Sequence, residues 1–375
     1  MKEIIALALT ATMLLSACAS PTNTEAEKKN ELENTKMTYH MPAEDSPHEG
    51  TWLTWPHSYT YGIEHQKEIE DIWVQMAMAL HPAEKVHILA YDKTEQSRIE
   101  QLLADAAVNM EQIDFVIAKS DDVWVRDTGP MFVFDEDNKL VIADFGFDGW
   151  GRKTPYKNDD KIPVAVGGAK NIPTIDISSF VLEGGAVELD GNGTLMATLS
   201  SIVSKNRNSN MTVKRAEEYL SEYLGIRNFI WLEGVIDEDI TDAHIDGTAR
   251  FLDDSTILTV SKNDFGKLYE SINMDDYTKL KNAKNADGKP YEIIELPLTK
   301  EIVDGADCYG SYLNYYVGNQ VVLVPIYEDV HDKSAIEIIA ELYPNREIVP
   351  VVVNDLFQYG GMLHCVTQQQ PKQFD

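Results

Sequence analysis

Cys365 is the residue of this sequence with the clearest potential for covalent chemistry. It follows a double glycine at 360–361, close to the end of the chain. A reactive cysteine works with a histidine that is adjacent in space rather than in sequence. On an extended segment His364 points to the opposite face, so we expect a partner from elsewhere, such as His244. The alternative is that Cys365 is a small buried apolar residue, which is how we interpret Cys308.

His244 and Asp246 are spaced to share one cavity. On an extended segment, residues two apart point to the same face, so the imidazole and the carboxylate would lie side by side. Ile245 would then point into the core. The alternative is a structural histidine beside a surface acid.

Two further acidic residues, Asp127 and Glu183, precede predicted hairpins. Asp127 follows Trp124, a candidate wall of a ligand site, although alternation places the Trp124 ring on the face of Arg126. Glu183 precedes two glycines, which allow the backbone to approach a ligand closely. The alternatives are that Arg126 forms an ion pair that holds a carboxylate in place, and that Glu183 is a solvated acid in a turn.

The motifs that usually bind metals and phosphates are missing from the sequence. It contains no CxxC or HExxH pair for zinc, and no GxGxxG or Walker motif. We therefore predict a site without a metal ion. Three cysteines are too few for a disulfide framework.

The chain is strongly acidic, with 32 Lys+Arg against 62 Asp+Glu and a formal net charge of −30. Binding to nucleic acid or docking on an anionic lipid surface requires a basic face, so the charge argues against both. A negative field concentrates cations at a cleft, which suits a cationic substrate. The alternative is that the charge serves only solubility.

The strands and helices that must position the candidate site residues are predicted to recur along the chain. Four β-hairpins are predicted, with polar turns near residues 137, 192, 254 and 318. Helices are predicted at 65–81, 95–107, 211–224 and 332–343. Thr51–Trp55 and Leu363–Thr367 would be two partial strands of a fifth unit. A hairpin plus helix that recurs about every sixty residues predicts an α/β fold with radial repetition. An ordinary mixed α/β sandwich is the alternative.

The N-terminal residues have the pattern of a targeting segment. An apolar run ends in Leu15-Ser16-Ala17-Cys18, which resembles the lipobox of bacterial lipoproteins. We predict a signal peptide at 1–17, a polar disordered tether at 18–36 and a folded domain at 37–375. The resemblance implies export and a membrane anchor through lipid on Cys18. The alternative is a secretory signal with an incidental cysteine.

Several long motifs occur in an order that resembles one family over most of the chain. They start at Met41 and include Trp124-Val-Arg-Asp127-Thr-Gly-Pro, Leu182-Glu183-Gly-Gly, Lys205-Asn-Arg-Asn and Gly360-Gly-Met-Leu-His-Cys365. The family is that of agmatine deiminases and Porphyromonas-type peptidyl-arginine deiminases, within the guanidine-modifying pentein superfamily. The resemblance implies a five-bladed α/β propeller with the site on its central axis.

The resemblance also implies a role for each candidate. Cys365 would be the nucleophile and His244 the general acid and base, while Asp127 and Asp246 would bind a guanidinium group. Glu183 matches an acid of the pocket. The family's reaction needs no metal or organic cofactor. Asp242-Ala-His-Ile-Asp stands where the agmatine enzymes usually show Gly-His-Val-Asp, but the spacing of histidine and aspartate is the same.

Two substrates remain open. An acidic pocket suits agmatine, which lacks a carboxylate, and we favour agmatine. Arg152-Lys153 lies where the peptidyl-arginine branch places cations for a C-terminal carboxylate, so an arginine-containing peptide is the alternative. A lipoprotein that binds cationic ligands without turnover is a third reading. Cys365 and His244 distinguish it, because binding alone needs no thiol.

Overall fold

Each of the four predicted hairpins forms an antiparallel pair of strands. The computed structural model describes residues 39–374, so the predicted signal peptide and tether lie outside the described residues. The pairs are β5 (Met131–Asp135) with β6 (Leu140–Gly146), β8 (Val187–Leu189) with β9 (Thr194–Thr198), β11 (Ala249–Asp253) with β12 (Thr256–Val260), and β14 (Tyr316–Val317) with β15 (Val321–Ile326).

A third strand extends each hairpin in the parallel direction. These strands are β7 (Thr174–Val181), β10 (Asn228–Leu232), β13 (Glu292–Leu296) and β16 (Glu347–Val352). A parallel neighbour requires a crossover, usually through a helix. The crossovers contain α7 (Ile162–Lys170), α9 (Val213–Leu224), α10 (Met274–Lys281) and α11 (Asp332–Leu342). Hairpin, helix and parallel strand are therefore one repeated unit.

The fifth unit joins the two ends of the described chain. β17 (Gln368–Pro371) pairs antiparallel with β2 (His48–Thr54), and β3 (Lys85–Ala90) and β4 (Ile113–Ile117) extend that sheet in parallel. α3 (Ile63–Leu80) and α4 (Lys93–Asp105) form the two crossovers. Two partial strands thus complete a fifth unit as predicted, but the C-terminal strand begins at Gln368 rather than Leu363.

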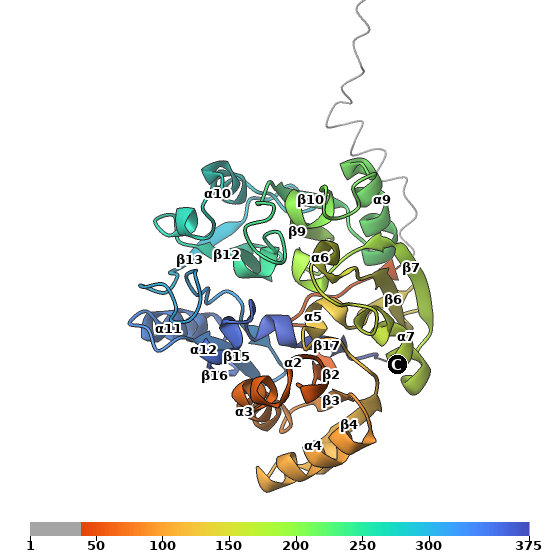
Figure 1. Ribbon diagram of the computed structural model, residues 1–375. Coiled ribbons are helices and arrows are strands. Elements are labelled where there is room, and N and C mark those ends of the chain that lie inside the picture. Colours follow the sequence, from red (N-terminus) through yellow and green to blue (C-terminus); the bar gives the residue numbers. More distant parts are fainter. Residues whose placement is uncertain (1–38, 375) are drawn as a thin grey trace, which may run out of the picture.

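Five sheets result, and Figure 1 shows them arranged around a common centre. A short strand, β1 (Tyr39–His40), pairs with β5 at the start of the described chain. The predicted five-bladed α/β architecture is confirmed. Short helical segments lie in the connections between strands, some within a unit and some between units: α2 (Ser58–Tyr61), α5 (Val125–Thr128), α6 (Gly149–Arg152), α8 (Leu199–Ile202), α12 (Asn354–Phe357), and the 3-10 turns η1 (Met110–Gln112), η2 (Asp159–Lys161), η3 (Gly184–Ala186), η4 (Ile245–Gly247), η5 (Phe265–Lys267) and η6 (His364–Val366).

The helices begin and end where local chemistry favours it. Asp92 caps α4 by accepting hydrogen bonds from the backbone N–H groups of Thr94 and Glu95. Thr212 caps α9 through Arg215 N–H, and Gly225, at φ 78°, ends that helix in the left-handed region. Such caps satisfy backbone groups that the helix itself leaves unpaired.

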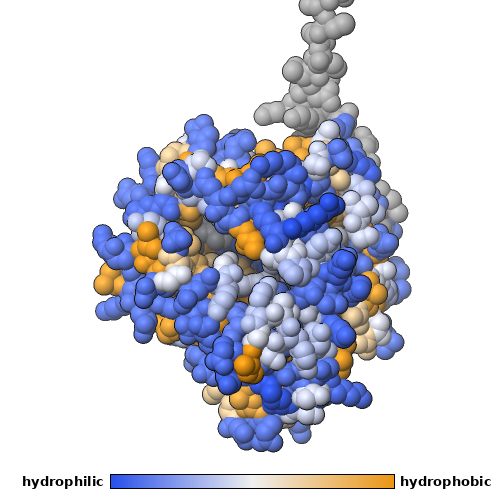
Figure 2. Space-filling view, viewed as in Figure 1, coloured by the Kyte–Doolittle hydropathy of each residue, from blue (hydrophilic) through white to orange (hydrophobic). Residues whose placement is uncertain are grey.

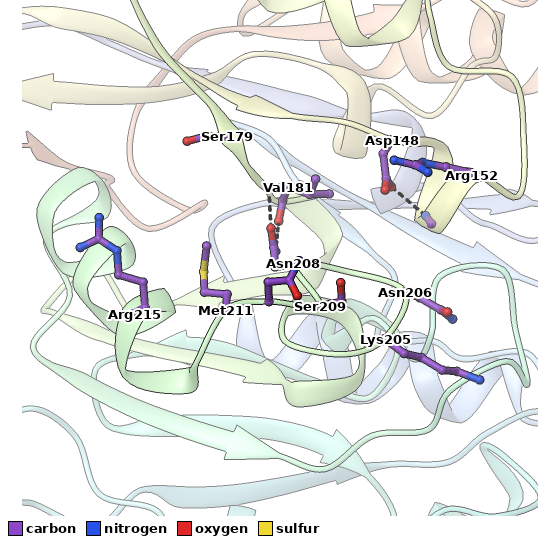
Figure 3. Close-up of a pocket in the computed structure, with 12 residues that line it drawn as sticks. Asp148, Arg152, Ser179, Val181, Lys205, Asn206, Asn208, Ser209, Met211 and Arg215 are labelled. Atoms are coloured by element: carbon purple, nitrogen blue, oxygen red, sulfur yellow. Dashed lines mark hydrogen bonds between the residues drawn. The ribbon is translucent and has the colours of Figure 1, made fainter.

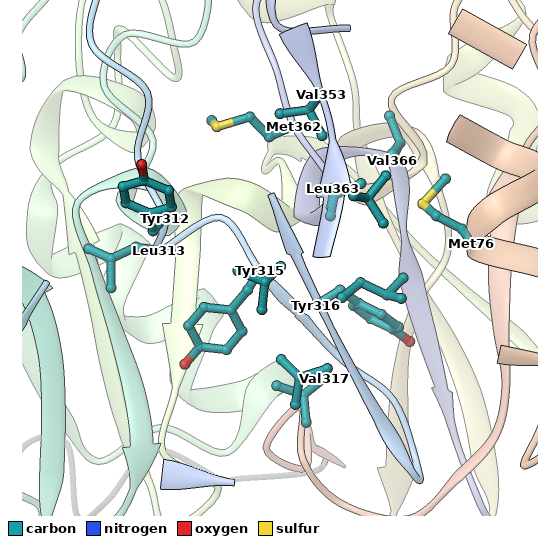
Figure 4. Close-up of a cluster of buried hydrophobic side chains, with 14 of the residues drawn as sticks. Met76, Tyr312, Leu313, Tyr315, Tyr316, Val317, Val353, Met362, Leu363 and Val366 are labelled. Atoms are coloured by element: carbon teal, nitrogen blue, oxygen red, sulfur yellow. The ribbon is translucent and has the colours of Figure 1, made fainter. Parts of the chain in front are cut away.

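The largest hydrophobic cluster lies under the C-terminal segment. Leu363 and Val366 are fully buried in it, together with Tyr315 and Tyr316 (Figure 4). A close-packed surrounding resists movement of the backbone. The residues on either side of Cys365 are therefore anchored in the core.

The surface fits the acidic composition. Figure 2 shows a face that is mainly hydrophilic, with hydrophobic groups in small patches. No helix within residues 39–374 combines the length and the hydrophobicity that crossing a bilayer requires.

Candidate active site

Five of the predicted site residues lie on or directly before four short helical turns that pack against one another at the centre of the molecule. Asp127 is on α5, Asp246 on η4 and Cys365 on η6, while Glu183 and His244 immediately precede η3 and η4. We had expected extended segments at His244 and Cys365, and this was wrong. The backbone turns there because Thr248 N–H bonds to the Ile245 carbonyl, and His364 N–H bonds to Asn314 instead of a neighbouring strand.

Gly185 marks the point at which three of these side chains converge. A Cβ atom at this position would lie 2.7 Å from His244 Nδ1, 2.9 Å from Asp127 Oδ1 and 3.1 Å from Asp246 Oδ2. Only glycine fits such a position without displacing its neighbours. The second glycine after Glu183 therefore makes room for the predicted site residues themselves.

Asp127 is a buried carboxylate that two donors hold in place. Trp150 Nε1 donates to Oδ2 at 2.9 Å, and Gly185 N–H donates to Oδ1 at 2.9 Å. Burial raises the pKa of Asp127, and the charges of Glu183 and Asp246 add to this increase against the opposing charge of His244. A cation that bound here would relieve this repulsion.

Asp246 is supported from behind by His364. Its Oδ2 lies 2.8 Å from His364 Nδ1, and the other ring nitrogen of His364 lies 2.7 Å from Glu44 Oε2. Burial raises the pKa of Asp246, but the hydrogen bond and charge of His364 outweigh it, so the pKa is lowered. His364 thus contacts the acids and not the sulfur, in agreement with the expectation that the sequence-adjacent pair is not the working one.

His244 lies between two carboxylates. Its Nδ1 is 3.7 Å from Asp127 Oδ2, and its Nε2 is 3.3 Å from Glu183 Oε2. Burial lowers the pKa of His244, but the charge of Asp127 and the hydrogen bond to Glu183 raise it to about 9. The imidazole is therefore protonated at neutral pH, with a proton on the nitrogen that faces Asp127.

Glu183 contacts His244, and like His244 and Asp246 it is not among the residues that line the Cys365 cavity. It is fully buried, and its Oε1 accepts a hydrogen bond from Arg207 Nε at 2.7 Å. Burial raises the pKa of Glu183, but Arg207 and His244 lower it further, so the carboxylate stays ionised. Its other oxygen, Oε2, lies 3.3 Å from His244 Nε2, so Glu183 is placed to orient the imidazole.

Cys365 faces the acids across a short distance. Its Sγ lies 3.9 Å from Asp246 Oδ2, and Asn314 Nδ2 lies 3.3 Å from Sγ. Burial raises the pKa of the thiol well above 9.0, and the charges of Asp246 and Asp127 raise it further. In the empty site the sulfur therefore keeps its proton.

A cavity of about 190 Å³ opens in front of Cys365 and Asp127. Aromatic rings form much of its wall, from Tyr61, His65, Trp124, Trp150 and Tyr359. Trp124 lines the cavity together with Asp127, so the prediction that it shares the face of Arg126 was wrong. The reason is that residues 125–128 form a helical turn and not a strand. Gly361 packs against the Trp124 ring, where a Cβ would lie 2.4 Å from a ring carbon.

Arg152 lies in a different cavity. A more open cavity of about 560 Å³ is lined by Arg152, Lys205 and Arg215 together with several Asn and Ser side chains (Figure 3). Arg152 is not among the residues that line the Cys365 cavity. Although the larger cavity is the more prominent hollow, none of the nucleophilic or proton-transferring candidates lines it.

Several residues of the site carry no signal in the sequence. Asn314 is fully buried and donates its amide to both Asp246 and Cys365, yet a single Asn in a predicted strand has no distinguishing pattern. The Glu44 carboxylate, close to the start of the described chain, lies 3.4 Å from Arg126 and 2.9 Å from Arg250. Arg126 thus holds Glu44 and not Asp127.

This arrangement can bind and attack a flat cation. Two buried carboxylates, Asp127 and Asp246, can accept the N–H groups of a guanidinium, which has five donors in a plane. Cys365, near Asp246, supplies a nucleophile, and His244, near Asp127, supplies a proton donor. Within residues 39–374 there is no group of three or more His, Cys, Asp or Glu side chains placed to hold a metal ion.

Comparison with known proteins places this site in a family. The sequence model of Porphyromonas-type peptidyl-arginine deiminases matches residues 40–371. Agmatine deiminase from Stutzerimonas stutzeri is 29% identical over 360 residues, which cover 90% of this chain and 96% of that protein.

Two solved structures extend the similarity to the fold. Agmatine deiminase from Enterococcus faecalis matches with a TM-score of 0.81 and 25% identity, covering 90% of this chain and 99% of that one. A putative arginine deiminase from Porphyromonas gingivalis matches with a TM-score of 0.81 and 32% identity, with the same coverage of 90% and 99%.

Proposed function

Since the chain belongs to the Porphyromonas-type peptidyl-arginine deiminase family, we propose that it hydrolyses the guanidinium group of agmatine. The products are N-carbamoylputrescine and ammonia. The observation that carries this proposal is the convergence of His244, Asp127 and Asp246 around Gly185, with Cys365 Sγ 3.9 Å from Asp246. Deimination of guanidines agrees with the names of the relatives, which are agmatine and arginine deiminases.

Substrate binding activates the nucleophile. Asp127 and Asp246 accept hydrogen bonds from the guanidinium N–H groups. The positive charge of the guanidinium offsets the charges of these two carboxylates, which raise the pKa of the Cys365 thiol. The Cys365 thiol then gives its proton to solvent, since His244 already carries one, and the thiolate sulfur forms a bond to the guanidinium carbon. The carbon becomes tetrahedral.

His244 moves the protons of both half-reactions. The imidazolium donates its Nδ1 proton to the departing nitrogen, so that ammonia leaves and an amidino-thioether remains on Cys365. The neutral imidazole then takes a proton from water, whose oxygen attacks the same carbon. Cleavage of the carbon–sulfur bond, with loss of the hydroxyl proton to solvent, releases the ureido product and restores the thiolate.

Peptidyl-arginine is the competing substrate, because the matching family bears that name. The carboxylate of a C-terminal arginine requires a cation nearby, but no Lys or Arg is among the residues that line the Cys365 cavity. The cavity is also smaller than the 300 Å³ or so at which sites for drug-sized ligands begin. Both observations favour agmatine.

The test is to incubate the purified protein with agmatine, free arginine and a peptide that ends in arginine, and to assay ammonia and ureido product. Agmatine is expected to give the highest kcat/KM, and Cys365→Ser is expected to abolish turnover while leaving part of the binding. An active serine variant would refute the nucleophile assignment. Turnover of none of the three would favour a lipoprotein that only binds cationic ligands.

Export and lipid attachment at Cys18 are a separate proposal, which rests on the Leu15-Ser16-Ala17-Cys18 sequence. Expression of the full chain in a bacterium with labelled palmitate is expected to label the wild-type protein and not Cys18→Ala. Label in both proteins, or in neither, would contradict the assignment of Cys18.

A further inference from the structure

The outer end of the Cys365 cavity differs chemically from its inner end. Asp127 and Cys365 lie inside, whereas Tyr61 and Tyr359 are 47% and 40% exposed and therefore stand at the mouth. Asp122 and His65 line the cavity as well. We refer to Tyr61, His65, Asp122 and Tyr359 as the outer group.

Asp122 carries the one carboxylate of the outer group, and its orientation is fixed. Tyr61 donates its hydroxyl to Oδ2 at 2.9 Å, and Val123 N–H donates to Oδ1 at 2.8 Å. A carboxylate oxygen accepts more than one hydrogen bond, so a ligand donor can still be bound. Fixed acceptors lose little entropy when a ligand arrives.

The rest of the outer group is aromatic and adds no positive charge. His65 is 8% exposed. The centroid of its ring lies 5.0 Å from that of Tyr61 and 4.3 Å from that of Tyr359, and the planes of the His65 and Tyr359 rings meet at 87°. Burial lowers the pKa of His65, so this ring is neutral at neutral pH. Neutral aromatic faces beside a carboxylate attract a cation and disfavour an anion.

From this arrangement we propose that Asp122, held by Tyr61, binds the primary ammonium group of agmatine while Asp127 and Asp246 bind its guanidinium. This inference rests on the proposed function and makes it more specific. The cavity then recognises both charged ends of a short dication. Guanidines that end in an alkyl group lose one contact, and those that end in a carboxylate meet repulsion.

The test compares agmatine with butylguanidine, which has the same guanidinium and a chain of the same length but no ammonium. In Asp122→Asn, the ratio of kcat/KM for agmatine to kcat/KM for butylguanidine is expected to fall about 10- to 100-fold, the effect of one charge-assisted hydrogen bond. The matched control is Glu68→Gln. Glu68 accepts a hydrogen bond from the Tyr359 hydroxyl, as Asp122 does from Tyr61, but it does not line the cavity. Its loss is expected to leave the ratio unchanged.

A second variant keeps the inference testable if Asp122→Asn does not fold, as judged by thermal melting. Tyr61→Phe removes the hydroxyl that orients Asp122, and it is expected to lower the same ratio by a smaller factor. An unchanged ratio in the folded variants, or an equal fall in Glu68→Gln, would overturn the role of Asp122. If the wild-type protein released ammonia from neither guanidine, the proposed function itself would fail.

Discussion

Asn314 holds its side-chain amide nitrogen 3.3 Å from Cys365 Sγ and 3.1 Å from Asp246 Oδ2. It is thus a hydrogen-bond donor for a sulfur atom that two carboxylates otherwise keep protonated. The same side chain accepts a hydrogen bond from the backbone N–H of His364, which orients the turn that carries Cys365.

Asn314→Ala is therefore expected to slow deimination about 10- to 100-fold, because a donor to the thiolate is lost and the turn is less fixed. The measurement is kcat as a function of pH, and a positioning role for the thiolate predicts that the limb on which the thiol ionises moves to higher pH. A lower kcat with an unmoved pH profile would indicate a purely structural role.

The thiol of the empty site is expected to react slowly with iodoacetamide at pH 7. Burial and the charges of Asp246 and Asp127 hold its pKa well above 9.0, so the thiolate fraction increases only in alkaline solution. Alkylation rates measured from pH 6 to 10 in a Cys18→Ser/Cys308→Ser background, which leaves Cys365 as the one thiol, should still be rising at the highest pH. A plateau near neutrality would show that the free enzyme already holds a thiolate.

His244 links stability to pH. Its pKa is about 9 in the folded protein and 6.5 as the ordinary value, so the folded state binds this proton more tightly. The stabilisation is complete below pH 6.5 and is lost as the pH rises through about 9. In urea titrations, the difference between the free energy of unfolding of the wild type and that of His244→Asn should decrease between pH 6.5 and about 9. A constant difference would contradict the raised pKa.

Arg207 is expected to be one of the strongest charged contributors to stability. It is fully buried between Glu183 and Asp242, with nitrogen–oxygen distances of 2.7 and 2.9 Å. Arg207→Met removes the cation shared by two buried carboxylates and leaves Glu183 with only His244 and Asp242 with only Lys153 as a cationic partner among the described residues, which should destabilise the fold by about 3–5 kcal/mol. The exposed pair Lys205–Asp237 is the control, and Lys205→Met should change the free energy of unfolding by about 0–1 kcal/mol. Equal effects in denaturant titrations would contradict this difference.

Gly185→Ala should reduce kcat about 100-fold or more, because its Cβ would displace His244, Asp127 or Asp246 from their positions. Gly247 is the matched control, since a Cβ there meets no atom within 4 Å. Gly247→Ala is expected to keep its activity in the ammonia assay. A fully active Gly185→Ala would show that the three groups need not converge at this point.

The sequence was sufficient for the repeated unit because its signals are local. Turn residues and β-branched runs mark the hairpins at 131–143 and 248–260, and the structure has strands at both. Prediction from the sequence failed where tertiary contacts determine the backbone conformation. His244 and Cys365 were expected on extended segments, yet Asp242 and Ala243 adopt φ values of 60° and 64°, and Cys365 lies on a 3-10 turn.

The site residues, too, could be predicted where a local motif marks them and could not be predicted where only tertiary contacts bring them to the site. Asp127 and Asp246 stand in recognisable motifs beside Trp124 and His244, so their positions could be predicted. Asn314 and Glu44 could not, because each reaches the site from a distant unit and is recognised only by its contacts. Arg152 belongs to a recognisable motif as well, but motif position alone did not indicate that it faces another cavity.

The pairing of β17 with β2 ties the nucleophile to closure of the ring. Cys365 lies three residues before Gln368, which pairs with Trp52 in the first strand of the fifth unit. A chain without this last strand therefore lacks the seam of the ring and one of the contacts that anchor the Cys365 turn. Pairing of the two ends of the described chain therefore also fixes the turn that carries Cys365.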